Sequence, residues 1–287
     1  MGTSSSYSGP GRNTPLLPPW ANDDGSEELQ PVSPDRQPTN GPTSDPLLDQ
    51  NQPGNVPIVP TINLMPARRH FGEYATGGGG NSLRQGARSY VRGMGGARNV
   101  ARASRAGKNA TRRLGGFLVD VATRGMQDAL EALQLSNTIG RPVEEVLATI
   151  TNILAPPSTS IDEAAARAAM SETLGELYIQ YGLEDGGLSN LEAMGADGIR
   201  TALQLSVTNY IYEKLLNVMQ SSLDEHNMSD HDLLKAEREI KLFIRETVHL
   251  ELESIDVMAV DWNGKQGERT AQQIYEQGYA IWEAMRI

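Results

Sequence analysis

The chain has 287 residues, with 36 acidic and 25 basic side chains and a formal net charge of −11. It contains no cysteine, which excludes disulfides, thiolate nucleophiles and cysteine-ligated zinc or iron–sulfur centres. No apolar run reaches the ~18 residues of a membrane helix, and the N-terminus lacks a secretory signal, so we expect a cytoplasmic protein with no membrane partner.

Charge divides the chain into three segments. Residues 1–65 carry seven acidic and two basic side chains, residues 66–115 one acidic and eleven basic, and residues 116–287 twenty-eight acidic and twelve basic. We therefore predict a disordered Pro/Gly/Ser-rich tail at 1–65, a basic Gly/Arg-rich linker or helices at 66–115, and an acidic all-helical domain at 116–287.

The tail contains too few apolar residues to offset the entropy that ordering would cost. Its most distinctive feature is the stretch LLPPW, formed by Leu16, Leu17, Pro18, Pro19 and Trp20. Trp is common at binding hot spots, which makes LLPPW a candidate docking motif. The alternative is that these five are ordinary linker residues.

The second residue, Gly2, has two interpretations. MGTSSS matches the N-myristoylation pattern, but one acyl chain binds membranes weakly and no basic cluster follows it in the tail. A small second residue also permits removal of Met1, which exposes the α-amine of Gly2. We favour this second interpretation.

In the middle segment, RRH at 68–70 and GGGG at 77–80 are typical of flexible linker. Arginines then recur at helical spacing, with Arg84, Arg88 and Arg92 on one face. A second group falls on a similar face: Arg98, Arg102, Arg105, Arg112 and Arg113. The segment is either a pair of basic helices or a basic coil that folds on binding.

This basic binding face suits either the phosphates of nucleic acid or an acidic protein surface. Only Tyr90 stands beside it as an aromatic ring for base stacking, which favours docking on a protein over nucleic acid.

The pattern from residue 116 onward is helical almost throughout, and the fold class is an all-α helical bundle preceded by the long disordered extension. Helices are expected over 116–133, from Pro142 to the Pro156–Pro157 pair, from a Ser160 cap to Tyr181, over 196–224, from Ser229 onward, and over 267–285. VHLELE at 248–253 alternates like a strand, so helix and strand both remain open there.

Catalytic signatures are missing: the sequence has no phosphate-binding loop, no H-E-x-x-H and no G-x-S-x-G. His226 and His231 lie five residues apart, which misses the spacing that places two metal ligands on one helix face. We therefore predict a protein that is not an enzyme and that has no cofactor and no metal.

MGTSSSYSGPG followed by LLPPW resembles the start of QatB proteins, from the bacterial Qat anti-phage defence systems. The residues that carry the resemblance, besides LLPPW and Met1, form an N-terminal recognition motif: Gly2, Thr3, Ser4, Ser6, Gly9 and Pro10. Such systems pair a QatB protein with an ATPase (QatA), a QueC-like enzyme (QatC) and a TatD-like DNase (QatD).

The resemblance implies a non-catalytic component of a defence complex. It implies that the QueC-like enzyme reads the tail and modifies Gly2, and that the helical domain docks on the ATPase, with the TatD-like DNase as a further partner. A nucleic-acid-binding adaptor that uses the arginines of 84–113 is the alternative.

Overall fold

The computed structural model describes residues 62–157, 159–225 and 229–285, and these belong to a unit that spans Pro57–Ile287. The predicted disordered tail, with its recognition motif from Gly2 to Pro10 and its docking motif from Leu16 to Trp20, lies outside the described residues. The described residues are helical wherever they have regular structure and include no strand, so the predicted all-α class is confirmed.

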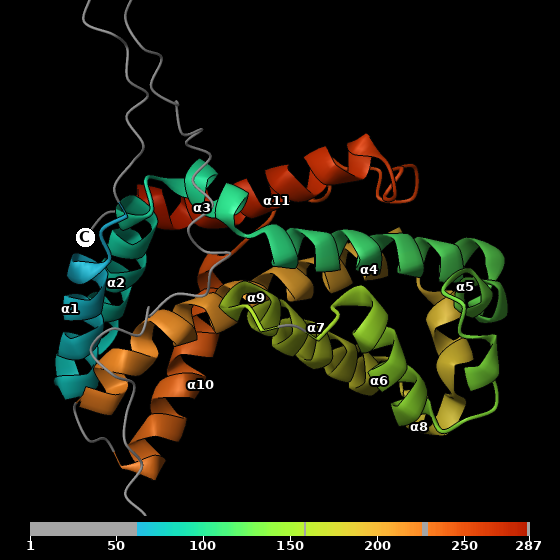
Figure 1. The fold of residues 1–287 in the computed structure, drawn as a ribbon, viewed down its shortest axis with the longest axis horizontal. Helices are drawn as coiled ribbons and strands as arrows, with labels where there is room; N and C mark the ends of the chain where they lie inside the picture. The colour runs from blue at the N-terminus through green and yellow to red at the C-terminus, as the bar shows by residue number, and fades with distance from the viewer. Residues whose placement is uncertain (1–61, 158, 226–228, 286–287) are drawn as a thin grey trace, which may run out of the picture. The chain divides into compact units, whose positions relative to one another are not determined.

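The first helices form mainly from the 66–115 segment, which is predicted as a basic Gly/Arg-rich linker or helices. They are α1 (Met65–Glu73), a π-helical turn η2 (Tyr74–Gly78), α2 (Gly79–Gly93), α3 (Ala97–Ala103) and α4 (Arg105–Arg124). In Figure 1, α1 and α2 lie side by side and α3 runs along the last helix.

The remaining helices follow in chain order. They are α5 (Met126–Ala132), α6 (Val143–Leu154), α7 (Ile161–Gln180), α8 (Leu183–Gly186), α9 (Ala196–Glu225), α10 (Asp230–Thr247) and α11 (Lys265–Ala284). Short 3-10 turns cover Ser136–Thr138 and Leu188–Ala193. The pair α7 and α9 packs along its length, and α4 contacts α5, α6, α7, α9 and α11 (Figure 1).

Of the two stretches predicted as flexible linker, RRH is helical, which corrects that expectation. RRH lies within α1, which buries Ala67 and Phe71 one turn apart, whereas GGGG lies at a kink between η2 and α2, where Gly77 and Gly79 have φ of +99° and +66°. The ring of Phe71 lies against the backbone of α2, because a Cβ added at Gly86 would come 2.1 Å from its Cε1 atom. A glycine here therefore permits close helix packing and does not indicate flexible chain.

The prediction of a single helix over 116–133 is also wrong. The structure has α4, which begins at Arg105 and crosses position 115 without a break, and then α5 after Gly125. Gly125 has a φ of +88°, a conformation that ends α4 and that side-chain-bearing residues rarely adopt.

The predicted helix starts at Ser160 and Ser229 are confirmed by their caps. The Ser160 hydroxyl accepts a hydrogen bond from the Glu163 backbone N–H at 3.2 Å, and Ser229 accepts one from Asp232 at 3.2 Å. Each cap satisfies a backbone donor that has no partner within the helix.

The strand-like stretch 248–253 is neither helix nor strand. The side-chain amide of Gln204 on α9 donates to the Val248 carbonyl at 2.5 Å and accepts from the Leu250 N–H at 3.1 Å. One side chain thus makes the two bonds that a neighbouring strand would make, while Val248 and Leu252 are buried.

Candidate functional site

The predicted arginine stripe of α2 lies on the flank of the helix that faces away from the core. The opposite side of α2 buries Leu83, Ala87 and Tyr90. Arg84 and Arg92 are exposed, whereas Arg88 is half-buried and its Nε is buried with no hydrogen-bond partner among the described residues. Two of the three predicted cations are therefore available to a partner.

The second group of arginines divides into two kinds. Arg98, Arg102 and Arg105 are exposed, and Arg98 Nε lies 3.9 Å from Glu276 Oε2 on α11. Arg112 and Arg113 are half-buried and bind main-chain carbonyls instead. Their Nη1 atoms donate to Trp262 at 2.7 Å and to Ile153 at 3.1 Å.

No carboxylate in the described part of the chain lies within ion-pair distance of Arg84, Arg92, Arg102 or Arg105. We define these four exposed arginines, together with Arg98, as the outer arginine face. In a chain of net charge −11, unpaired exposed cations on three successive helices form a surface that attracts anionic partners.

A groove runs between α4 and α11 and shares Arg105 with this face. It has a volume of about 390 Å³ and is lined by Arg105, Lys108, Asn109 and Arg112 from α4 and by Glu268, Ala271 and Gln272 from α11. Lys108 is not among the residues predicted from the arginine spacing. Its spacing of three residues from Arg105 is the signal that could have placed it on the same helix face.

Burial lowers the pKa of Lys108, and the positive charges of Arg105 and Arg102 lower it further, against the opposing effect of Asp162. Its Nζ donates to the neutral Gln272 Oε1 at 2.5 Å and has no carboxylate partner among the described residues. The groove therefore holds an excess of positive charge.

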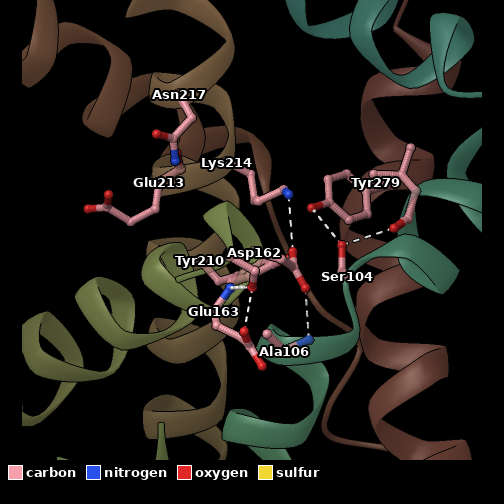
Figure 2. A network of polar contacts seen from close by, with 11 residues as sticks. Ser104, Ala106, Asp162, Glu163, Tyr210, Glu213, Lys214, Asn217 and Tyr279 are labelled. Carbon is pink, nitrogen blue, oxygen red and sulfur yellow. Dashed lines mark hydrogen bonds and ion pairs between the residues drawn. The ribbon is translucent and has the colours of Figure 1, made fainter. Parts of the chain in front are cut away.

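Asp162, in the first turn of α7, joins three helices through polar contacts and is likewise not among the site residues predicted from the sequence. One carboxylate oxygen accepts from the Ala106 N–H at the start of α4 at 2.9 Å. The other accepts from the Tyr210 hydroxyl at 2.5 Å and from Lys214 Nζ at 3.0 Å, both on α9. Figure 2 shows Asp162 between these three groups.

Buried hydroxyl groups extend this junction into the core. Thr111 on α4 is 2.8 Å from the Ser206 hydroxyl and 3.0 Å from that of Tyr275, and Ser104 is 3.3 Å from the Tyr279 hydroxyl. Burial raises the pKa of Tyr275 and Tyr279, so both rings stay neutral. These groups satisfy one another, which is the arrangement of a structural network.

Tyr90, the aromatic residue beside the arginine stripe, is 2% exposed, and burial raises its pKa. Its ring belongs to the core and presents no face for a base to stack on.

Within residues 62–157, 159–225 and 229–285, no group of three or more His, Asp or Glu side chains is placed to hold a metal ion. No helix in that part of the chain combines the length and apolar character that a membrane crossing requires.

Comparison with family models gives one match, the Qat anti-phage system associated protein QatB, over residues 95–282. The chain belongs to the QatB family. The match begins just before α3 and ends in α11, so it includes the α4–α11 groove and Asp162 but not α1, α2 or the tail. The family assignment thus comes from a different part of the chain than the N-terminal resemblance. Neither the curated proteins nor the solved structures that were compared contain a match.

Proposed function

We propose that this QatB-family chain is a non-catalytic component of the defence complex, whose helical unit docks on the ATPase partner through the outer arginine face. The observation that carries the proposal is the absence of ion-pair partners for Arg84, Arg92, Arg102 and Arg105 within the described residues. An acidic surface on the partner would supply the missing carboxylates, and complementary charge sets the orientation and rate of such encounters.

The ionisable groups of the interior support a non-catalytic role. Asp162, Lys214 and Tyr210 bind one another and the start of α4, so their bonds are used to hold helices together. Arg112 and Arg113 likewise bind carbonyls of the Trp262 loop and of α6.

Charge reversal of exposed arginines tests the docking. The full-length triple variant Arg84→Glu, Arg92→Glu, Arg102→Glu is expected to lose co-elution with the ATPase in size-exclusion chromatography. Arg112 and Arg113 are left intact because their bonds support the fold. The matched control is Arg141→Glu, Lys235→Glu, Arg238→Glu, three exposed cations outside the face, which should co-elute normally. Co-elution of the first variant at wild-type level would contradict the proposal.

The alternative, a nucleic-acid-binding adaptor, is less favoured because the ring of Tyr90 is buried. The same triple variant separates the two functions. If the wild-type chain binds DNA or RNA with a steep salt dependence and the variant does not, while assembly with the ATPase is unchanged, the adaptor function holds instead.

For the tail, we propose that the QueC-like partner reads Gly2 to Pro10 and LLPPW and acylates the α-amine of Gly2. QueC enzymes activate a deazaguanine carboxylate with ATP and pass the acyl group to ammonia. Here the Gly2 nitrogen would attack the activated carbonyl carbon, an amide C–N bond would form, the bond to the nucleotide phosphate would break, and the nitrogen would lose one proton.

An α-amine suits this step because its ordinary pKa of about 7.7–8.0 leaves an appreciable neutral fraction at pH 7, unlike lysine near 10.4. Intact mass of the full chain, produced with and without the QueC-like partner, is the measurement. We expect an added acyl mass on the N-terminal peptide only with the partner, lost in Gly2→Pro and kept in the control Gly11→Pro. Identical masses in both preparations would refute the modification.

A further inference from the structure

The groove between α4 and α11 is built by two helix faces that point toward each other. Arg105, Lys108 and Arg112 recur at three- and four-residue spacing on α4, and Glu268 and Gln272 stand opposite on α11. The buried Ala271 also lines the hollow. Unlike the outer arginine face, the groove has walls on two sides and a volume of about 390 Å³.

Its charges are unbalanced. Three cations share the groove with a single carboxylate, Glu268, and none of the three makes an ion pair with a carboxylate of the described residues. Their hydrogen bonds go to neutral oxygens, from Lys108 to the Gln272 side chain and from Arg112 to the Trp262 carbonyl. Like charges on adjacent turns of a helix repel, so this arrangement is costly unless an anion joins it.

Two further observations indicate that the groove between α4 and α11 is an anion site. The Nε of Arg112 is buried without a hydrogen-bond partner in the described residues, although a buried guanidinium donor is normally paired. The pKa of Lys108 is lowered, first by burial and then by Arg105, and the opposing effect of Asp162 does not offset them.

From this geometry we propose that the groove binds the phosphate group of a small phosphomonoester. Its charge of +2 complements a phosphate dianion, which accepts several hydrogen bonds from guanidinium and ammonium donors. The amides of Asn109 and Gln272 add neutral donors, and the volume lies in the range of small-ligand sites. No aromatic ring lines the groove, so the phosphate is the recognised part. This site goes beyond the proposed docking function and does not depend on it.

Isothermal titration calorimetry on the full chain at low salt tests the proposal with three probes: inorganic phosphate, adenosine monophosphate and adenosine. We expect saturable binding of the two phosphates and none of adenosine. Binding by adenosine monophosphate but not by inorganic phosphate would identify an organic phosphate as the ligand and still support the site. A 5′-phosphorylated oligonucleotide that binds when neither small phosphate does would overturn the small-ligand proposal.

Two variants move the affinity in opposite directions. Lys108→Gln removes a charged donor and should weaken phosphate binding about tenfold or more. Glu268→Gln removes the one carboxylate of the groove and should strengthen binding about two- to fivefold, a gain that a misfolded protein cannot give. Lys235→Gln, on the exposed surface of α10, is the matched control and should leave the affinity unchanged. No saturable phosphate binding, or the same affinity in all three variants, would overturn the inference.

Discussion

At the scale of single residues, Asp162 shows how a plain sequence feature acquires a structural role. In the sequence it is one of two acids in the first turn after the Ser160 cap, where acidic side chains commonly stabilise a helix. In the structure it also binds the first turn of α4 and two side chains of α9. Those partners lie 48 to 56 residues away, a separation that no local pattern encodes.

Replacing Asp162 by Asn is expected to destabilise the fold by about 2 kcal/mol, because it removes charge-assisted hydrogen bonds and leaves the largely buried Lys214 without its counter-ion. Urea unfolding followed by circular dichroism measures the effect. The matched control is Asp197→Asn, which removes a carboxylate that is 98% exposed and should change the stability little. Equal midpoints for the two variants would contradict the structural role of Asp162.

Glu213 on α9 lies near the same junction, but Figure 2 shows its carboxylate pointing away from Asp162. Burial raises its pKa, the charges of Glu172 and Glu237 raise it further, and Lys241 opposes them. The folded state therefore holds this proton more tightly than the unfolded state does, so ionisation of Glu213 at neutral pH reduces stability.

Glu213→Gln is accordingly expected to raise the melting temperature at pH 7. The gain should shrink as the pH falls and disappear below the ordinary glutamate pKa of about 4.3, where the carboxyl is protonated in both states. Thermal melts across pH 3.5 to 7 check the sign, with the exposed Glu251→Gln as control. A loss of stability at pH 7 would show that Glu213 is held by favourable contacts instead.

At the scale of elements, the packing of α4 depends on glycines that leave room for large aromatic side chains. A Cβ added at Gly107 would come 2.6 Å from the Tyr210 ring, and one at Gly115 would come 2.7 Å from the Trp262 ring. The same residues lower helix propensity, which is why a glycine-rich, arginine-rich stretch is easily interpreted as linker from sequence alone.

Gly107→Ala is therefore expected to destabilise the protein by about 1–3 kcal/mol, because the crowding against Tyr210 exceeds the gain in helix propensity. Gly175→Ala is the matched control in the interior of α7, where a Cβ meets nothing within 4 Å, and it should stabilise by about 0.5–1 kcal/mol. Denaturant unfolding of both variants gives the comparison. If both are stabilising, the close approach of α4 and α9 is not a constraint.

The stretch 248–253 marks the limit of element prediction from pattern. Two of its alternating apolar residues, Val248 and Leu252, are buried in the structure. Its hydrogen-bond partner, however, is the amide of Gln204 on a helix, and alternation carries no information about which group supplies those bonds.

At the scale of the whole molecule, the sequence predicted the all-α class, the helices α7 and α10 that begin at serine caps, and the approximate extents of α9 and α11. It did not predict that α1 to α3 pack into the same unit. Their buried faces are built mostly from Ala and Gly with single aromatic residues such as Phe71 and Tyr90, so their apolar signal is weak. Most of the arginines of α1 to α3 are exposed, and their regular spacing is a stronger pattern in the sequence than that of the buried face.

This packing predicts how the chain can be shortened. A fragment of residues 62–287 retains every described helix, whereas residues 116–287 lose α1 to α3 and half of α4. Without them, Tyr210, Tyr275 and Tyr279 would lose the α4 and α3 surfaces that cover them, and Asp162 would lose the Ala106 donor.

We therefore expect residues 62–287 to unfold cooperatively with a melting temperature close to that of the full chain. Residues 116–287 should show no cooperative transition and should be digested rapidly by a nonspecific protease, since exposed apolar surface of this size is not compatible with a stable fold. Circular dichroism melts and timed proteolysis of the two fragments make the comparison, and adding residues 62–115 in trans provides the control for recovery. A cooperative, protease-resistant 116–287 fragment would show that the basic helices are accessory to the fold.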